Sequence, residues 1–211
     1  MSTPSLTVIE HPLVQHKVSV LRDMTTPSDV FRATCREITV LCAYETFAGL
    51  PLTTTTVTTP LTTMEAPTMA GPSPVVVGIL RAGQIMVDAV LSILPEAAVG
   101  LVGMARHHDT HEAYEYYRRL PHGIDRRPVV VVDPMLATGG SAVHALDVLA
   151  EEGCSNPRLL SIIGCPEGVA AVHERHPNVP IVLAALDQGL NDDAYIVPGL
   201  GDAGDRLYGT T

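Results

Sequence analysis

The stretch Val129–Ser141, which reads VVVVDPMLATGGS, constrains the fold more than any other part of the chain. Its four consecutive valines form an uninterrupted apolar run, which is typical of a strand buried on both faces of a parallel sheet. The small residues Thr138–Ser141 then lead into an apolar segment that favours a helix over Ala142–Ala150. A buried strand, a tight loop and a helix in succession are the repeating unit of α/β folds.

Asp133 directly follows the predicted strand. It therefore lies at the carboxyl edge of the sheet, where open α/β sheets bind their ligands. The turn Thr138–Ser141 places backbone N–H groups at the start of a helix, which is a ready site for an anion. This combination predicts a phosphate held by backbone groups, with a sugar hydroxyl or a metal near the Asp133 carboxylate.

Other apolar runs alternate with helical patterns in the same way. We predict strands over Val75–Leu80, Ala98–Ala105, Val129–Val132, Arg158–Ile163 and Ile181–Leu186. We predict helices from about Ile85 to Leu94, from Gly140 to about Glu152, and over Gly168–Arg175. Repeated units of this kind imply a parallel sheet whose strands are joined by right-handed crossovers.

The flanking segments have different patterns. Asp29–Phe47 has apolar residues three and four positions apart, which predicts an amphipathic helix. In the Thr- and Pro-rich tract Thr53–Pro74, low complexity favours a flexible linker, whereas the strand preference of threonine favours an edge hairpin. Arg106–Pro121 is polar and weakly patterned, which is typical of a mobile active-site loop or a hairpin.

Composition excludes several classes of protein. The net charge of −10 leaves no broad basic surface for nucleic acid. No apolar run approaches the ~18 residues that a membrane helix needs, and residues 1–10 lack the basic flank and apolar core of a signal peptide. The four cysteines form no C-x-x-C pair and are expected to be buried thiols in a reducing compartment. We therefore expect a cytoplasmic protein without nucleic-acid or membrane partners.

Two arginines stand just past predicted strands. Arg81 has a guanidinium that matches phosphate oxygens, and Gly83 permits a close backbone approach beside it; the alternative is a surface arginine before a helix. In the next polar cluster, residues 106–112, Arg106 is a candidate for a phosphate contact, and this role is favoured over a metal site at the histidines. His107 and His111 would share a face, and hold a metal, only if this polar segment were helical.

The tail Gln188–Gly209 contains five glycines and lies outside the predicted sheet. Core packing does not require so many positions that tolerate unusual backbone angles. A loop that wraps closely around a flat ligand does require them. Asp202 and Asp205 in this tail are candidates to hold water, a metal or a ribose hydroxyl.

With these residues in view, the chain resembles the uracil phosphoribosyltransferases, which have the type I phosphoribosyltransferase fold. The resemblance runs almost end to end, and it is carried by HPLVQHK at His11–Lys17, LRAG at Leu80–Gly83, DPMLATGGS at Asp133–Ser141, PEG at Pro166–Gly168, DQGLN at Asp187–Asn191 and YIVPGLGDAGDRLYGT at Tyr195–Thr210. The last motif is the most specific, because relatives that use purines or orotate lack it. The resemblance implies a single α/β domain over residues 1–211. Its central parallel sheet, flanked by helices, spans about 75–187, and a small hood comes from 1–74 and 188–211.

The resemblance also implies a reaction, in which uracil and 5-phosphoribosyl 1-diphosphate give UMP and diphosphate with Mg²⁺ as cofactor. The family pattern places the phosphoribosyl donor at Arg81, Arg106, Asp133, Pro134, Met135, Leu136, Ala137, Thr138, Gly139, Gly140, Ser141 and Asp202. It places uracil, mainly through backbone groups, at Ile196, Gly201, Asp202 and Ala203. The residues expected to be catalytic are Arg106, Asp133 and Asp202.

One departure from the family concerns the metal. Asp133-Pro134 stands where many type I relatives have two consecutive acids. We therefore expect Mg²⁺ to be held mainly by substrate oxygens and water, with no direct protein ligand. The family also implies a homodimer or a higher homo-oligomer, and a GTP effector, because some bacterial members respond to GTP.

Two alternatives use the same fold. An RNA-binding regulator of pyrimidine operons should carry a basic face, which the net charge of −10 disfavours. A nucleotide sensor without catalysis is disfavoured because Arg81, Arg106, Asp133 and Asp202 are all present.

Overall fold

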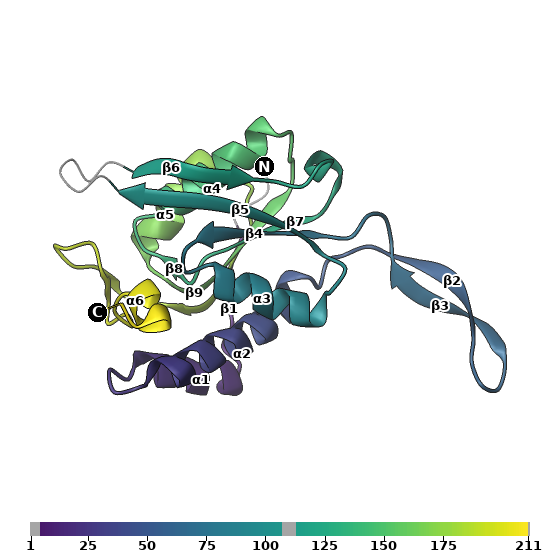
Figure 1. Ribbon diagram of the computed structural model, residues 1–211, viewed down its shortest axis with the longest axis horizontal. Helices are drawn as coiled ribbons and strands as arrows, with labels where there is room; N and C mark the ends of the chain where they lie inside the picture. Colours follow the sequence, from purple (N-terminus) through teal and green to yellow (C-terminus); the bar gives the residue numbers. More distant parts are fainter. Residues whose placement is uncertain (1–4, 107–112, 211) are drawn as a thin grey trace.

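The computed structural model describes residues 5–106 and 113–210. Within these ranges the main sheet has eight strands in the order β1-β10-β9-β7-β4-β5-β6, with β8 beside β9 (Figure 1). Their bounds are Leu6–Val8 for β1, Val75–Leu80 for β4, Ala98–Arg106 for β5, Ala113–Arg119 for β6, Val129–Val132 for β7, Met135–Leu136 for β8, Pro157–Gly164 for β9 and Ile181–Leu186 for β10. All pairs are parallel except β5 with β6. The predicted α/β fold with a central, mostly parallel sheet is confirmed.

Helices cover both faces of this sheet (Figure 1). The first layer consists of α1 (Pro12–Arg22), α2 (Ser28–Thr46) and α3 (Gln84–Ile93), and the second of α4 (Gly140–Glu151) and α5 (Pro166–Arg175). Successive side chains of a strand point to opposite faces. In β7, Val130 and Val132 therefore pack with the first layer, and Val129 and Val131 with the second. Burial on both faces explains why β7 is a run of valines.

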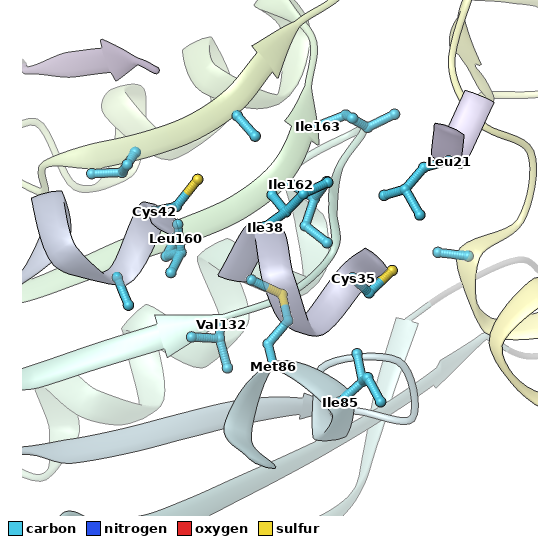
Figure 2. Packing of buried hydrophobic residues seen from close by; sticks show 14 of the residues in the cluster. Leu21, Cys35, Ile38, Cys42, Ile85, Met86, Val132, Leu160, Ile162 and Ile163 are labelled. Atoms are coloured by element: carbon cyan, nitrogen blue, oxygen red, sulfur yellow. The ribbon is translucent and has the colours of Figure 1, made fainter. Parts of the chain in front are cut away.

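The first helical layer holds a continuous core (Figure 2). Cys35, Ile38 and Cys42 of α2 pack there with Met86 of α3 and Leu160 of β9. The four cysteines are buried and free, as predicted. Burial raises the pKa of Cys35 and of Cys42 to about 12, so both remain neutral thiols that act as small apolar side chains.

The threonine-rich tract forms an antiparallel hairpin, hereafter the arm. Its strands β2 (Leu52–Thr58) and β3 (Thr63–Met69) make a two-stranded sheet of their own. Nearly every side chain of the arm is exposed, and the arm projects from the opposite side of the molecule to the C-terminal helix α6 (Ala203–Tyr208) (Figure 1). The hairpin interpretation is confirmed, although the hairpin stands apart from the main sheet.

Three strands of the main sheet, β1, β6 and β8, lie outside the five predicted ones. β6 pairs antiparallel with β5, so the polar stretch after Arg106 contains the second strand of a hairpin. β1 has only three residues, pairs with β10 and forms the edge of the sheet. A strand this short shows no periodicity, and an edge strand needs little apolar character on its exposed side.

Candidate active site

The candidate site lies where the order of the sheet reverses. The strand after β4 along the chain, β5, lies on one side of it, whereas β7, β9 and β10 lie in succession on the other side. Loops that leave neighbouring parallel strands diverge at such a point, and the crevice between them binds ligands in open α/β sheets. Gly78 of β4 pairs in register with Val132 of β7. Arg81 and Asp133, which follow these strands, therefore reach the same edge.

A cleft of about 460 Å³ opens at this edge. The loops after β4 and β7 line one side of it with Arg81, Ala82, Asp133, Met135, Ala137 and Ser141. The C-terminal tail lines the other side with Asp193, Ala194, Tyr195, Asp202, Ala203 and Gly204. The structure thus brings the loop after β7 and the glycine-rich tail to face each other across one cleft.

A larger cavity of about 620 Å³ lies at the base of the arm, at the amino end of β7. Arg127 donates there to the backbone carbonyls of Ser73 and Pro74, and Arg158 donates to that of Thr46. These arginines therefore hold the base of the arm. None of the residues predicted to bind a ligand lines this larger cavity, so the cleft is the better candidate for the active site.

A smaller recess of about 90 Å³ adjoins the cleft and is lined by Asp133 and by residues 135–142. We call residues 133–141, which supply most of this lining, the phosphate loop. Gly139 has φ +81°, and a Cβ added there would lie 2.9 Å from the carbonyl oxygen of Gly168. A Cβ added to Gly168 would lie 2.4 Å from the carbonyl oxygen of Ala137. The two glycines therefore let the phosphate loop rest directly on the start of α5, and α4 begins at the recess with Gly140.

Asp133 lines both the recess and the cleft and is half-buried between them. Loss of solvation raises the pKa of its carboxyl to about 7, while the backbone N–H of Met135 acts in the opposite direction. The carboxyl therefore changes protonation state near neutral pH. In its ionised form it accepts hydrogen bonds from hydroxyl groups and stabilises positive charge in the cleft.

The loop that carries Arg81 contacts α6. The Tyr208 hydroxyl donates to the carbonyl oxygen of Arg81 at 2.9 Å, and the Arg81 guanidinium carbon lies 5.7 Å from the centre of the Tyr208 ring. The Leu80–Arg81 peptide bond is cis. A Cβ added to Gly83 would lie 2.5 Å from the carbonyl oxygen of Ile79 and 2.6 Å from that of Val132. Gly83 thus permits this loop to pack closely on the backbone of β4 and β7.

The tail is a compact series of turns. The strands β11 (Gly189–Leu190) and β12 (Ile196–Val197) form a short hairpin. At its tip the Asn191 side chain accepts the backbone N–H groups of Asp193 and Tyr195, and Ala194 has φ +61°. After this hairpin, Asp202 caps α6 by accepting the N–H of Asp205 at 2.9 Å. The tail therefore presents backbone groups in fixed directions.

The predicted site residues do not all line the cavities. Leu136, Thr138, Gly139 and Gly140 line the recess together with the loop residues of the cleft. Pro134, Ile196 and Gly201 line neither cavity. The Pro134 carbonyl accepts the N–H groups of residues 162 and 163, the Ile196 side chain is in the core, and Gly201 forms a turn with φ +78°.

Three further predictions concern side chains that the structure either does not describe or does not place in the cleft. Arg106 ends β5, but its side chain lies outside the described part of the chain, and so do His107 and His111. The carboxylate of Asp205 accepts the hydroxyl of Thr210 at 2.6 Å and does not line the cleft.

Sequence reasoning missed Asp193, Ala194 and Tyr195 as lining residues. The available signal was the Asn at position 191, because asparagine favours a turn that binds its own backbone two residues later. Within residues 5–106 and 113–210, no three His, Cys, Asp or Glu side chains are grouped to hold a metal ion. The helices described in these ranges include none long and apolar enough to cross a membrane.

Known proteins share both the sequence and the fold. The model of the uracil phosphoribosyltransferase family matches residues 8–210. A uracil phosphoribosyltransferase from Paracoccus denitrificans is 49% identical over 210 residues, which cover 100% of each chain. Another from Thermoanaerobacter sp. is 51% identical over 203 residues, which cover 96% of this chain and 97% of the relative.

Solved structures agree with these matches. The AQ2163 protein from Aquifex aeolicus is 35% identical with a TM-score of 0.91, and the match covers 98% of this chain and 99% of that one. An adenine phosphoribosyl transferase from Trypanosoma brucei, 17% identical, has a TM-score of 0.57 over 92% of this chain and 90% of its own, which shows the shared type I phosphoribosyltransferase fold. The chain belongs to the uracil phosphoribosyltransferase family.

Proposed function

We propose that the cleft transfers the phosphoribosyl group of 5-phosphoribosyl 1-diphosphate to uracil and gives UMP and diphosphate, a step of pyrimidine salvage. A bond forms between uracil N1 and the anomeric carbon as the bond to diphosphate breaks, and uracil loses its N1 proton. The observation that carries this proposal is the convergence of the phosphate loop and the glycine-rich tail on one cleft.

The phosphate loop is the proposed site of the donor's ribose 5-phosphate. Its recess lies at the start of α4, where the first backbone N–H groups of a helix lack partners within the helix. Asp133, which lines both the recess and the cleft, is proposed to accept the ribose hydroxyls. Arg81, with Arg106 at the end of β5, is proposed to bind the diphosphate, because a guanidinium matches two phosphate oxygens at once.

Chemistry at the anomeric carbon should develop positive charge on the ribose ring. Little covalent work by the protein is then needed, and positioning with electrostatic stabilisation accelerates the reaction. The ionised form of Asp133 is the proposed stabilising group on the ribose side. Asp202, which lines the opposite wall, is proposed to face the donor as well.

The tail is the proposed site of uracil. Backbone groups of Ile196 and Gly201–Ala203 would read the acceptor–donor–acceptor edge of the base. Cytosine presents an amino group at one of those positions and would leave a buried donor facing a donor, which is a costly mismatch. We therefore expect strong preference for uracil.

Magnesium is the proposed cofactor. Asp133, Asp193 and Asp202 line the cleft, but no three acidic, His or Cys side chains of the described ranges are grouped to hold a metal, so Mg²⁺ would be held mainly by substrate oxygens and water. Mg²⁺ commonly combines one or two carboxylates with substrate phosphates and water. When bound, it would offset the charge on the leaving diphosphate.

The remaining proposals concern the protein as a whole. We propose that the chain is one domain and that it forms a homodimer or a higher homo-oligomer. The exposed apolar side chains of the arm, Leu52, Val57, Leu61 and Met64, support a self-contact there. A GTP effector rests on the family resemblance alone. A cytoplasmic location is supported by the four free thiols and by phosphorylated substrates.

The decisive assay supplies the purified protein with the phosphoribosyl donor, Mg²⁺ and one base at a time. Uracil, cytosine, hypoxanthine and orotate are run in parallel, with a reaction lacking Mg²⁺ as control. We expect UMP and diphosphate in equal amounts from uracil only. Comparable turnover of another base, or no turnover of uracil, would overturn the proposed function.

A further inference from the structure

The residues 197–202, hereafter the base loop, are held by an ion pair that does not touch the cleft. Arg22, the last residue of α1, donates through Nη1 and Nη2 to the two carboxylate oxygens of Asp187 at 2.8 and 2.5 Å. Only 4% of the Asp187 side chain is exposed. A two-pronged pair of this kind fixes both distance and orientation. Neither residue lines the cleft.

Both members of the pair also bind the same loop residue. The backbone N–H of Gly199 donates to Asp187 at 2.9 Å, and the carbonyl oxygen of Gly199 accepts from Arg22 Nη1 at 2.9 Å. A Cβ added to Gly199 would lie 2.0 Å from the carbonyl oxygen of Ile196. Gly199 has no side chain that could anchor the loop here, and the two charged groups hold it through its backbone N–H and carbonyl.

A second arginine, Arg206, binds the next residue of the base loop, Leu200. Arg206 of α6 donates to the carbonyl oxygens of Leu200 at 2.8 Å and Asp23 at 2.6 Å, and also to that of Leu21. Its guanidinium carbon lies 4.3 Å from the centre of the Phe31 ring. Two consecutive loop residues, Gly199 and Leu200, are thus tied to the end of α1.

From this geometry we propose that Arg22 and Asp187 are positioning residues that set the distance of the base loop from the phosphoribosyl donor, and so govern the binding of uracil. The inference rests on the proposed function of the cleft. Recognition through backbone groups requires the backbone itself to be fixed. Within the described ranges, the side-chain hydrogen bonds of Arg22 and Asp187 reach each other and Gly199 but not the phosphate loop, which is built on β7, α4 and α5. We therefore expect the donor site to keep its shape when the pair is broken.

The kinetic test compares Arg22→Lys, Arg22→Met and Asp187→Asn with the wild type. We expect the KM for uracil to rise about tenfold in Arg22→Met and Asp187→Asn, because small displacements of a bound reactant have large effects. The KM for the donor should stay within about twofold. Arg22→Lys keeps the charge but loses the fork, so its effect should be smaller than that of Arg22→Met. Equal rises in both KM values, or an unchanged KM for uracil, would overturn the proposal.

Asp147→Asn and Arg175→Lys are matched controls. Arg175 Nε donates to Asp147 at 3.0 Å and joins α5 to α4, with both side chains more exposed than Asp187. The same exchanges there should leave the KM for uracil unchanged. A rise in the controls equal to that in Asp187→Asn would show a general loss of stability and contradict a positioning role.

Hydrogen exchange tests, without any turnover, whether the Arg22–Asp187 pair holds the base loop. The amide of Gly199 should exchange at least about tenfold faster in Asp187→Asn than in the wild type, while amides of β7 keep their rates. An unchanged exchange rate at Gly199 would show that the pair does not hold the loop. Failure of the wild type to form UMP would instead refute the proposed function, and the exchange result would still decide whether the pair holds the loop.

Discussion

Asp133→Asn should make the protein more stable while removing most of its activity. The carboxyl lies half-buried between the recess and the cleft, and burial raises its pKa from 3.8 to about 7. Asparagine has nearly the same shape, and its side-chain oxygen still accepts the N–H of Met135. The substitution therefore removes the charge with little change in packing.

The size of the effect follows from the pKa of Asp133. Between about pH 4 and pH 7, Asp133 keeps a proton in the folded chain that it has lost in the unfolded chain. The contribution of Asp133 to the free energy of unfolding therefore falls as pH rises through this range and is constant above it. At 1.36 kcal/mol for each pH unit between the two pKa values, ionising Asp133 costs about 4 kcal/mol in full and about 2 kcal/mol at pH 5. Asp133→Asn does not bear this cost.

Urea unfolding at a fixed protein concentration measures this difference between pH 5 and pH 8. The free energy of unfolding of Asp133→Asn should exceed that of the wild type by a margin that grows about 2–3 kcal/mol over this range. Asp88→Asn removes an exposed carboxyl on α3 and is the control, which should follow the wild-type pH profile. A margin that does not change with pH would refute the reasoning.

Three further results are expected. The kcat/KM for the donor should fall as pH drops below about 7, since ionised Asp133 is the active form; a pH profile without this acid limb would contradict that role. Gly201→Val should abolish uracil binding and spare the donor, whereas Gly71→Val, which has the same φ of +78° in open space, should lose similar stability and keep uracil binding, as calorimetry with each ligand can show. Gly83→Ala should lower the free energy of unfolding by about 1–3 kcal/mol, because its Cβ would meet two carbonyl oxygens; an unchanged urea midpoint would argue against this close approach.

Local pattern was enough to predict the centre of the fold. The strands β4, β7 and β10 have the predicted bounds, because strands buried on both faces must be apolar throughout. The position of Asp133 at the carboxyl edge followed from the same rule. The arm was ambiguous because nearly all its side chains are exposed, so no alternation marks its strands.

Contacts between distant segments were beyond local pattern. Arg22 and Asp187 lie at the ends of two elements far apart in sequence, and nothing in either segment indicates the other. The wall of the cleft formed by Asp193 and Tyr195 depends on a turn at Ala194, a residue that rarely adopts positive φ. Such features arise from tertiary packing and turn chemistry, which periodicity does not report.

A crystal structure of the protein with UMP would test the central claim most directly. The account predicts that the 5′-phosphate lies in the recess of residues 133–142 and that uracil lies against Ile196 and Gly201–Ala203, so that one nucleotide spans the cleft. A nucleotide bound with its phosphate away from that recess, or with its base away from the tail, would contradict it.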